Sequence, residues 1–142
     1  YAKSNKPLLG ICLGMQILLT VSYEFGVHKG LGLIEGKVIK ISNEKNKEIK
    51  IPHMGWNEIY PNNNKKEWKN KILKNSSIGK SFYFVHSFVC ITKDYDSTIA
   101  VCNYSDISIP AVIATGNVYG CQFHPEKSAD NGLAVLKNFC ET

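Results

Sequence analysis

The stretch that decides the fold is Lys6-Pro7-Leu8-Leu9-Gly10-Ile11-Cys12-Leu13-Gly14-Met15-Gln16. Its first half is a short apolar run after a polar start, which is typical of a buried strand in a parallel sheet. From Leu13 onward the apolar residues recur with helical spacing, and this pattern predicts a helix that continues to about Tyr23. The stretch therefore predicts a strand that enters a helix through a sharp turn.

Cys12 lies at the centre of that turn, in the pattern Gly-x-nucleophile-x-Gly. Such a turn holds its central residue in a strained conformation with the side chain exposed, and we expect Gly10 and Gly14 to prevent clashes between strand and helix. The helix N-terminus favours a thiolate, and the N–H of Leu13 can donate to an oxyanion. We predict that Cys12 is a nucleophile. The alternative is a buried structural cysteine.

His124 is the candidate base, because it directly follows an apolar strand predicted over residues 118–123. Catalytic groups of α/β folds tend to gather at strand ends. Pro125 cannot continue the strand, and Glu126 is close enough in sequence to orient the imidazole. The pattern predicts a triad of Cys12, His124 and Glu126. The alternative is a surface histidine with an incidental acid beside it.

The rest of the chain reads as many short strands and one closing helix. Strands are predicted over residues 36–41, 49–53, 56–60, 81–88, 98–103, 111–115 and 118–123, with a polar loop at Asn43–Lys47, a hairpin turn at Gly116-Asn117 and an amphipathic helix over 132–139. With 142 residues, no repeat and no linker, we expect one domain over residues 1–142. An α/β sandwich needs helices on both faces of its sheet, so the shortage of helices indicates that an N-terminal βα portion is missing.

Composition excludes several classes of function. The net charge of +5 comes from lysine without any arginine, the residue preferred for bidentate contacts to phosphate or guanine, so we expect no nucleic-acid partner. No apolar run approaches the roughly 18 residues of a membrane span. Five cysteines without paired spacing indicate reduced thiols in the cytoplasm. Cys121 and His124 lack a second ligand pair, so we expect no metal site, and we expect no cofactor.

Two motifs together resemble the class I, triad-type glutamine amidotransferases: Gly10-Ile11-Cys12-Leu13-Gly14-Met15-Gln16 and Gln122-Phe123-His124-Pro125-Glu126. Four further segments resemble the glutaminase subunits of imidazole glycerol phosphate synthase, an enzyme of histidine biosynthesis: Gly30-Leu31-Gly32-Leu33-Ile34, Pro52-His53-Met54-Gly55-Trp56-Asn57, Tyr83-Phe84-Val85-His86-Ser87 and His124-Pro125-Glu126-Lys127-Ser128. They follow the family's order over almost the whole chain. The implied fold is a flavodoxin-like α/β sandwich around a mostly parallel sheet, with an antiparallel β portion.

The resemblance also implies residue roles. Cys12 attacks the side-chain amide of glutamine, His124 moves the protons and Glu126 orients His124. The implied substrate-binding residues are Gln16, Glu24, Ser87 and Phe88, and the implied oxyanion donor is the amide of Leu13. The implied partner is a (β/α)8-barrel cyclase, bound as a heterodimer that receives the ammonia. Implied interface residues are Trp56, Asn57, Tyr83 and Lys127, although aromatic residues are also typical of a core and a lysine of a solvated surface.

The match departs from the family at the N-terminus. The βαβαβ portion that precedes the nucleophile turn, with its second oxyanion donor, has no counterpart, and we expect a truncated chain. Three alternatives stay open: a paralogue that supplies ammonia for amidino groups of surface-glycan sugars, a non-catalytic docking module, and a cysteine hydrolase that acts on another amide.

Overall fold

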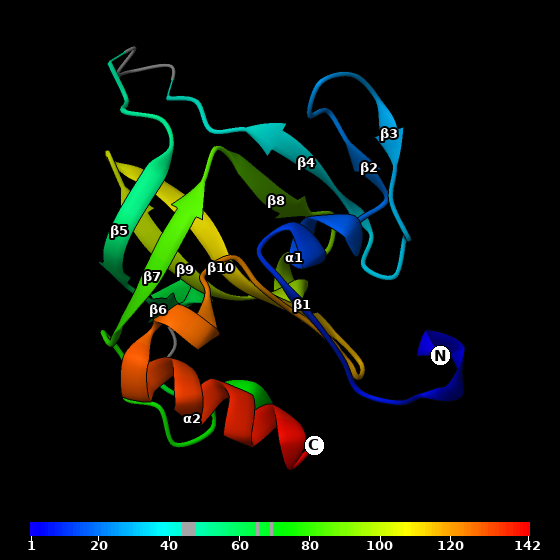
Figure 1. Cartoon of the computed structure of the whole chain (residues 1–142), viewed down its shortest axis with the longest axis vertical. Coiled ribbons are helices and arrows are strands. Elements are labelled where there is room, and N and C mark those ends of the chain that lie inside the picture. Colours follow the sequence, from blue (N-terminus) through cyan, green and yellow to red (C-terminus); the bar gives the residue numbers. More distant parts are fainter. Residues whose placement is uncertain (44–47, 65, 69) are drawn as a thin grey trace.

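The computed structural model, which describes residues 1–43, 48–64, 66–68 and 70–142, places strand β1 (Leu8–Ile11) directly before helix α1 (Leu13–Ile17) (Figure 1). The other strands are β2 (Val21–Ser22), β3 (His28–Lys29), β4 (Gly36–Lys40), β5 (His53–Glu58), β6 (Tyr60–Pro61), β7 (Ser81–His86), β8 (Phe88–Thr92), β9 (Thr98–Tyr104), β10 (Ile107–Thr115) and β11 (Val118–Cys121). Helix α2 (Ala129–Cys140) closes the chain, and short 3-10 helices are η1 (Ala2–Ser4), η2 (Asn62–Asn64), η3 (Lys71–Leu73), η4 (Tyr95–Ser97) and η5 (Pro125–Lys127). No helix in these ranges is long and apolar enough to cross a membrane.

Three sheets make up the β structure of the described residues. The largest has the order β1-β11-β10-β9-β6, the second has the order β3-β2-β4-β8, and the third pairs β5 with β7. β1 runs parallel to β11 and β2 runs parallel to β4, whereas the other pairs are antiparallel. The predicted α/β class is confirmed, but the sheets are mixed instead of mostly parallel. The reason is local, because tight turns such as the confirmed one at Gly116-Asn117 can join only antiparallel strands.

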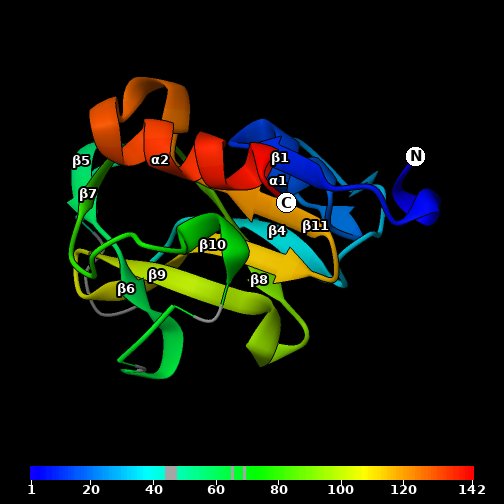
Figure 2. The ribbon, with the colours of Figure 1, turned by 90° about the horizontal axis from the view of Figure 1, so that it is seen from below.

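β11 has a helix on each of its faces, as an α/β sandwich requires. Tyr119 packs in the cluster that contains Val135 of α2, and its ring lies 6.2 Å from that of Phe139. Val118 packs in the other cluster, with Met15 of α1. Figure 2 shows α2 lying along one face of the large sheet. β11 is therefore fully buried, and it supports the edge strand β1, which carries the turn at Cys12.

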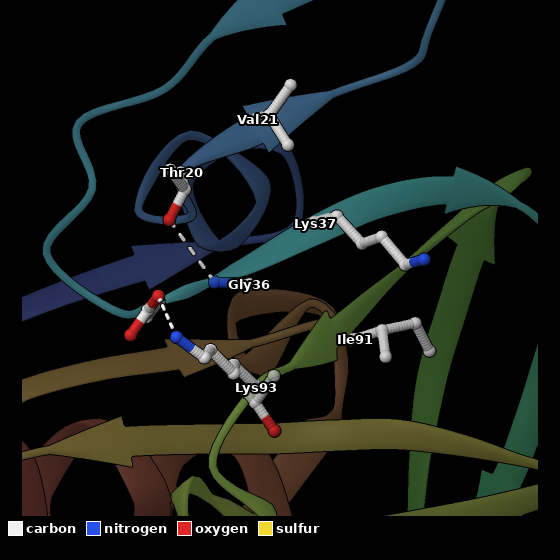
Figure 3. A pocket seen from close by; sticks show the side chains of 8 residues that line it. Thr20, Val21, Gly36, Lys37, Ile91 and Lys93 are labelled. Carbon is white, nitrogen blue, oxygen red and sulfur yellow. Dashed lines mark hydrogen bonds and ion pairs between the residues drawn. The ribbon is translucent and has the colours of Figure 1, made fainter.

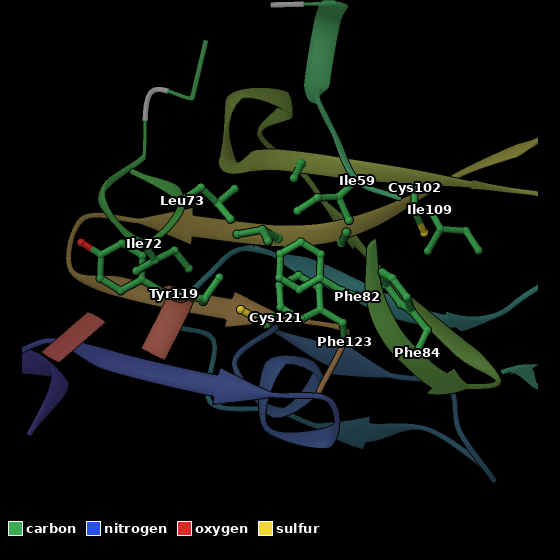
Figure 4. Packing of buried hydrophobic residues seen from close by; sticks show 14 of the residues in the cluster. Ile59, Ile72, Leu73, Phe82, Phe84, Cys102, Ile109, Tyr119, Cys121 and Phe123 are labelled. Carbon is green, nitrogen blue, oxygen red and sulfur yellow. The ribbon is translucent and has the colours of Figure 1, made fainter. Parts of the chain in front are cut away.

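The larger core lies between the large sheet and the two-stranded sheet of β5 and β7 (Figure 4). The Phe82 and Phe123 rings are tilted by 30° with centroids 4.2 Å apart, and Phe84 meets Phe123 edge to face at 5.8 Å. All three rings are fully buried. Phe123 comes directly before His124, so this aromatic packing holds the end of the segment that carries the candidate base.

Helix α1 is shorter than predicted, because it ends at Ile17 instead of near Tyr23. The glycine-rich loop folds back onto its last turn: the amides of Leu31 and Leu33 donate to the carbonyls of Ile17 and Leu18 over 2.8 and 2.9 Å. These carbonyls would otherwise continue the helix. Residues 21–22 form strand β2 instead.

Two strand predictions were also wrong. Residues 49–52 form no strand, and β5 starts at His53 and continues through Met54-Gly55. The single strand predicted over 81–88 is split at Ser87, because β7 pairs with β5 while β8 pairs with β4 in another sheet. Of the predicted polar loop at Asn43–Lys47, residues 44–47 lie outside the described part of the chain.

Candidate active site

Cys12 occupies the turn between β1 and α1 with φ 51° and ψ −107°, a conformation that L-residues rarely adopt. A side chain at Gly10 would place its Cβ 2.5 Å from the carbonyl oxygen of Gly14, so a glycine is required there. A Cβ at Gly14 would meet nothing within 4 Å, so the expected packing role is confirmed for Gly10 and wrong for Gly14. The turn holds a strained, half-buried cysteine at the start of a helix.

Parallel pairing brings the two halves of the predicted triad to the same edge of the sheet. Ile11 of β1 is in register with Cys121 of β11, and the Cys12 amide donates to the Cys121 carbonyl over 2.7 Å. His124 lies three residues beyond Cys121, and its amide donates to the Tyr83 carbonyl over 2.9 Å. Both candidate residues therefore follow the carboxyl ends of neighbouring parallel strands, where sites of α/β folds are usually found.

Glu126 contacts the His124 side chain directly. The imidazole Nδ1 lies 2.7 Å from Glu126 Oε1. Because a carboxylate only accepts hydrogen bonds, Nδ1 carries a proton, which leaves Nε2 as the nitrogen that can take a proton from a thiol. The histidine side chain is 18% exposed and the glutamate side chain 47%, so the pair lies at the surface of the described chain.

The environment of Cys12 raises the pKa of its thiol. Burial is the largest cause, and the negative charges of Glu126 and Glu24 act in the same direction. A hydrogen bond from the Leu13 amide and one from the Gln122 side chain oppose these effects and lower the pKa. The resting group is therefore a thiol at neutral pH, and it needs a base for activation.

A cavity of about 220 Å³ opens beside the turn. Its lining includes Leu13, Gln16 and Glu24, which are three of the predicted site residues, together with Ser22, His28 and Lys29. Gln16 reaches across to β8, where its Nε2 donates to the Phe88 carbonyl over 3.4 Å. Ser87 lies between β7 and β8, and its carbonyl accepts from the Ile41 amide over 2.9 Å. Gln16 and Glu24 thus line one cavity, whereas Phe88 is joined to it through Gln16 and Ser87 precedes Phe88 in the chain.

Of the four predicted interface residues, Tyr83 accepts from the His124 amide through its carbonyl and Lys127 follows Glu126, whereas the Asn57 side chain contacts His53 and the Asn103 carbonyl. Trp56 and Tyr83 face each other across β5 and β7, with ring centroids 6.1 Å apart. Trp56 is 56% exposed, which excludes the core interpretation for this residue. Asn57 is half-buried on β5, and exposed Lys127 follows Glu126 in η5.

Sequence reasoning missed three groups next to the turn. Gln122 is fully buried and its Nε2 lies 3.9 Å from Cys12 Sγ, and the Val85 carbonyl lies 3.8 Å from the same sulfur. His53 and His86 form a buried hydrogen-bonded pair behind Phe88. Gln122 stands in the same motif as His124, which could have suggested a role. The contacts of Val85 and the two histidines depend on strand pairing over long sequence separations.

A second cavity of about 350 Å³ lies between β2, β4 and β8 (Figure 3). Lys93 and Glu35 form an ion pair of 2.6 Å at this cavity, and the Gly36 amide donates to Thr20 Oγ1 over 3.3 Å. No predicted site residue lines it. It is therefore separate from the turn that holds Cys12.

Comparison with known proteins defines the class. The family model for glutamine amidotransferase class-I matches residues 1–142. The chain belongs to the class-I glutamine amidotransferase family.

Curated relatives narrow the assignment. An imidazole glycerol phosphate synthase subunit HisH 1 from Legionella pneumophila (strain Lens) is 46% identical over 143 residues, which cover 99% of this chain and 67% of the relative. A subunit HisH from Wolinella succinogenes is 48% identical, over 99% of this chain and 66% of the relative. Within the class, the chain belongs with these HisH subunits. It spans about two thirds of their length.

Solved structures share the fold. A glutamine amidotransferase from Thermotoga maritima matches with a TM-score of 0.62 and 18% identity, over 99% of this chain and 49% of that chain. The glutaminase domain of CTPS from Trypanosoma brucei, solved with bound acivicin, matches with a TM-score of 0.61 and 17% identity. The match covers 99% of this chain and 62% of that chain. At these identities the match shows the fold alone.

Proposed function

We propose that this chain carries a glutaminase site that hydrolyses glutamine to glutamate and ammonia. The observation that carries the proposal is the placement of Cys12 and His124 after neighbouring parallel strands, with Glu126 on the far nitrogen of the imidazole. A thiol, a base and a group that orients the base form the usual arrangement for nucleophilic attack on an amide.

The reaction follows from these positions. His124 Nε2 takes the proton of the Cys12 thiol, and the sulfur attacks the side-chain amide carbon of glutamine. The Leu13 amide stabilises the oxyanion. His124 then gives its proton to the leaving nitrogen, which departs as ammonia and leaves a glutamyl thioester. Water, deprotonated by His124, adds to the thioester, and the thiol is restored as glutamate leaves.

The cavity beside the turn suits the zwitterionic end of an amino acid. Glu24 offers a negative charge to an α-ammonium, and Lys29 offers a positive charge to an α-carboxylate. The Gln16 amide uses its Nε2 for the Phe88 carbonyl, so its oxygen is the end that serves a ligand. Phe88 contacts this cavity only through its carbonyl, which accepts from Gln16 Nε2, and with the adjoining Ser87 it is proposed to lie along the substrate backbone.

The proposed destination of the ammonia is a (β/α)8-barrel cyclase that makes imidazole glycerol phosphate in histidine biosynthesis, in the cytoplasm. The names of the relatives support this pathway over a surface-glycan one. The residues proposed to meet the cyclase are Trp56, Asn57, Tyr83 and Lys127, of which Asn57 is half-buried with its side-chain amide bonded within the chain. The exposed Trp56 ring is the kind of anchor that dominates protein interfaces.

Release of glutamate from glutamine tests the proposal, with the complete gene product alone and with a barrel cyclase and its ligand. We expect turnover that rises with the partner and disappears in Cys12→Ala. The matched control is Cys140→Ala, which removes an exposed thiol at the end of α2. Absence of turnover in every combination would instead support the docking module, and turnover that survives in Cys12→Ala would refute the nucleophile.

A further inference from the structure

Two buried histidines face each other behind the proposed glutamine cavity. His53 of β5 and His86 of β7 are in register, and they are 2% and 6% exposed. His53 Nδ1 lies 2.9 Å from His86 Nε2. The His53 ring is also held between Phe84 and Tyr104, with ring centroids at 4.9 and 4.2 Å. Neither histidine has a role in the proposed reaction.

The hydrogen bonds of the pair run in a single direction. His86 Nδ1 lies 2.8 Å from the Phe88 carbonyl, which can only accept, so the proton of His86 sits on Nδ1. His86 Nε2 is then an acceptor, and His53 must donate to it from Nδ1. His53 Nε2 is therefore also an acceptor. Both rings are neutral in this arrangement, and every ring nitrogen has a defined role.

Asn57 supplies the donor at the far end. Its Nδ2 lies 3.3 Å from His53 Nε2 and 2.8 Å from the Asn103 carbonyl oxygen. These two contacts use both hydrogens of the Asn57 amide. Burial lowers the pKa of His53 to about 4, with the neighbouring His86 acting in the same direction, and burial also lowers the pKa of His86. These shifts agree with two neutral rings at neutral pH.

At the near end, the Phe88 carbonyl contacts Gln16, which lines the cavity. It accepts from His86 over 2.8 Å and from Gln16 Nε2 over 3.4 Å. The shorter bond holds the carbonyl, and the longer bond sets which end of the Gln16 amide turns toward a ligand. A change at His86 therefore reaches the cavity through one shared oxygen atom.

We propose that His86 and His53 are positioning residues of the glutamine cavity, which hold the Phe88 carbonyl so that it orients the Gln16 amide. The inference rests on the proposed glutaminase function and assigns no proton transfer to either ring. It predicts an effect on substrate binding and little effect on the chemical step, because Cys12, His124 and Glu126 are not part of this chain of hydrogen bonds.

The test compares His86→Phe, His86→Asn and His53→Phe in the complete gene product with its cyclase partner. Loss of one hydrogen bond that holds the site predicts that KM for glutamine rises about 5- to 10-fold in His86→Phe, with kcat changed less than about 2-fold. The amide of His86→Asn can still donate to the Phe88 carbonyl, so this variant recovers most of the binding. The same KM in folded His86→Phe as in the unmodified protein, or a fall in kcat alone, would overturn the proposal.

A buried amide elsewhere gives the matched control. Asn62 donates from Nδ2 to the Thr98 carbonyl over 3.0 Å, and it does not line the glutamine cavity. We expect Asn62→Leu to lower stability without raising KM. A KM increase of the same size in Asn62→Leu would show that general loosening of the fold explains the effect.

Alkylation of Cys12 provides a second readout that needs no turnover. Iodoacetamide reports the reactivity of the thiol, whereas acivicin, an electrophilic amino acid, must also fit the cavity. We expect the ratio of acivicin to iodoacetamide rates to fall in His86→Phe and, to a smaller extent, in His53→Phe. If His86→Phe does not fold, an unchanged ratio in His53→Phe overturns the proposal. Failure of the glutaminase function is distinct, because the unmodified protein would then show neither turnover nor acivicin labelling.

Discussion

The backbone amide of Cys12 donates a hydrogen bond to the carbonyl of Cys121 over 2.7 Å. This bond continues the parallel ladder of β1 and β11 one residue beyond Ile11. The turn that holds the thiol is thereby tied to the segment that carries Gln122 and His124. A rigid connection of this kind keeps a nucleophile and its base in fixed relation before a substrate arrives.

Gln122→Leu should change reactivity and stability in opposite directions. The Gln122 side chain lowers the pKa of Cys12, so its loss raises that pKa and slows alkylation by iodoacetamide at pH 7.5. Gln122 Oε1 is buried without a hydrogen-bond partner among the described residues, so replacement by leucine should leave stability equal or higher. Alkylation rates across pH and urea unfolding measure the two effects. An unchanged pH midpoint of the alkylation rate in Gln122→Leu would contradict the contact between Gln122 and the Cys12 thiol.

Glu126→Gln should separate thiol reactivity from turnover. The Glu126 charge raises the pKa of Cys12, so removing it lowers that pKa and speeds alkylation at neutral pH. Glutamine turnover should nevertheless fall by about 10²- to 10⁴-fold, because a neutral amide no longer stabilises the imidazolium and its NH2 group can donate to Nδ1, which favours the wrong tautomer. Both rates are measured on the same preparation. Equal slowing of alkylation and turnover would argue against Glu126 as a charge that raises the pKa of Cys12.

Alanine at the two glycines of the turn should have opposite effects on stability. Gly10→Ala forces a Cβ against the backbone of α1, where it would lie 2.5 Å from the Gly14 carbonyl oxygen, and overpacking of this kind costs about 1–3 kcal/mol or more. Gly14→Ala meets open space inside a helix, where alanine is favoured over glycine by up to about 1 kcal/mol. Urea unfolding of both variants measures the difference. Similar urea midpoints for Gly10→Ala and Gly14→Ala would show that the turn relaxes to accommodate the added Cβ at position 10.

Stability should decrease as the pH falls from 6.5 toward 4. The buried His53 has a pKa of about 4 in the folded protein against 6.5 for the unconstrained side chain, so only the unfolded state takes up a proton in that window. The contribution of neutral His53 to the free energy of unfolding is therefore complete above pH 6.5. As the pH falls below 6.5, this contribution is lost at up to about 1.4 kcal/mol per pH unit. Unfolding free energies of the unmodified protein and of His53→Phe, measured from pH 7.5 to 4.5, isolate this term. An identical dependence of the unfolding free energy on pH in the two proteins would refute the contribution of His53.

The strand, the turn at Cys12 and the closing helix were predictable because their signals are local. Apolar spacing marks β1 and α2, and the glycine pattern marks the turn. The pairing of His124 with Glu126 was also predictable, since two residues of separation and Pro125 leave little freedom. Their contact at 2.7 Å agrees with that prediction.

The remaining elements depend on partners that are distant in sequence. The early end of α1 follows from hydrogen bonds with the loop at Leu31–Leu33, and the break at Ser87 follows from the pairing of its two flanking strands with different sheets. Periodicity within a short window contains no information about either partner.

The sequence by itself predicted the strand–turn–helix unit, the candidate nucleophile, the candidate base and the acid beside it, since each is a short segment whose chemistry requires those residues. Tertiary structure alone decided that β1 lies parallel to β11, which places Cys12 beside Gln122 and the His124 segment. It also decided that His53, His86 and Phe88 form a continuous chain of hydrogen bonds behind Gln16. The bond between the two histidines spans 33 positions and the bond from Gln16 to Phe88 spans 72, and only the packing of the complete sheets specifies such contacts.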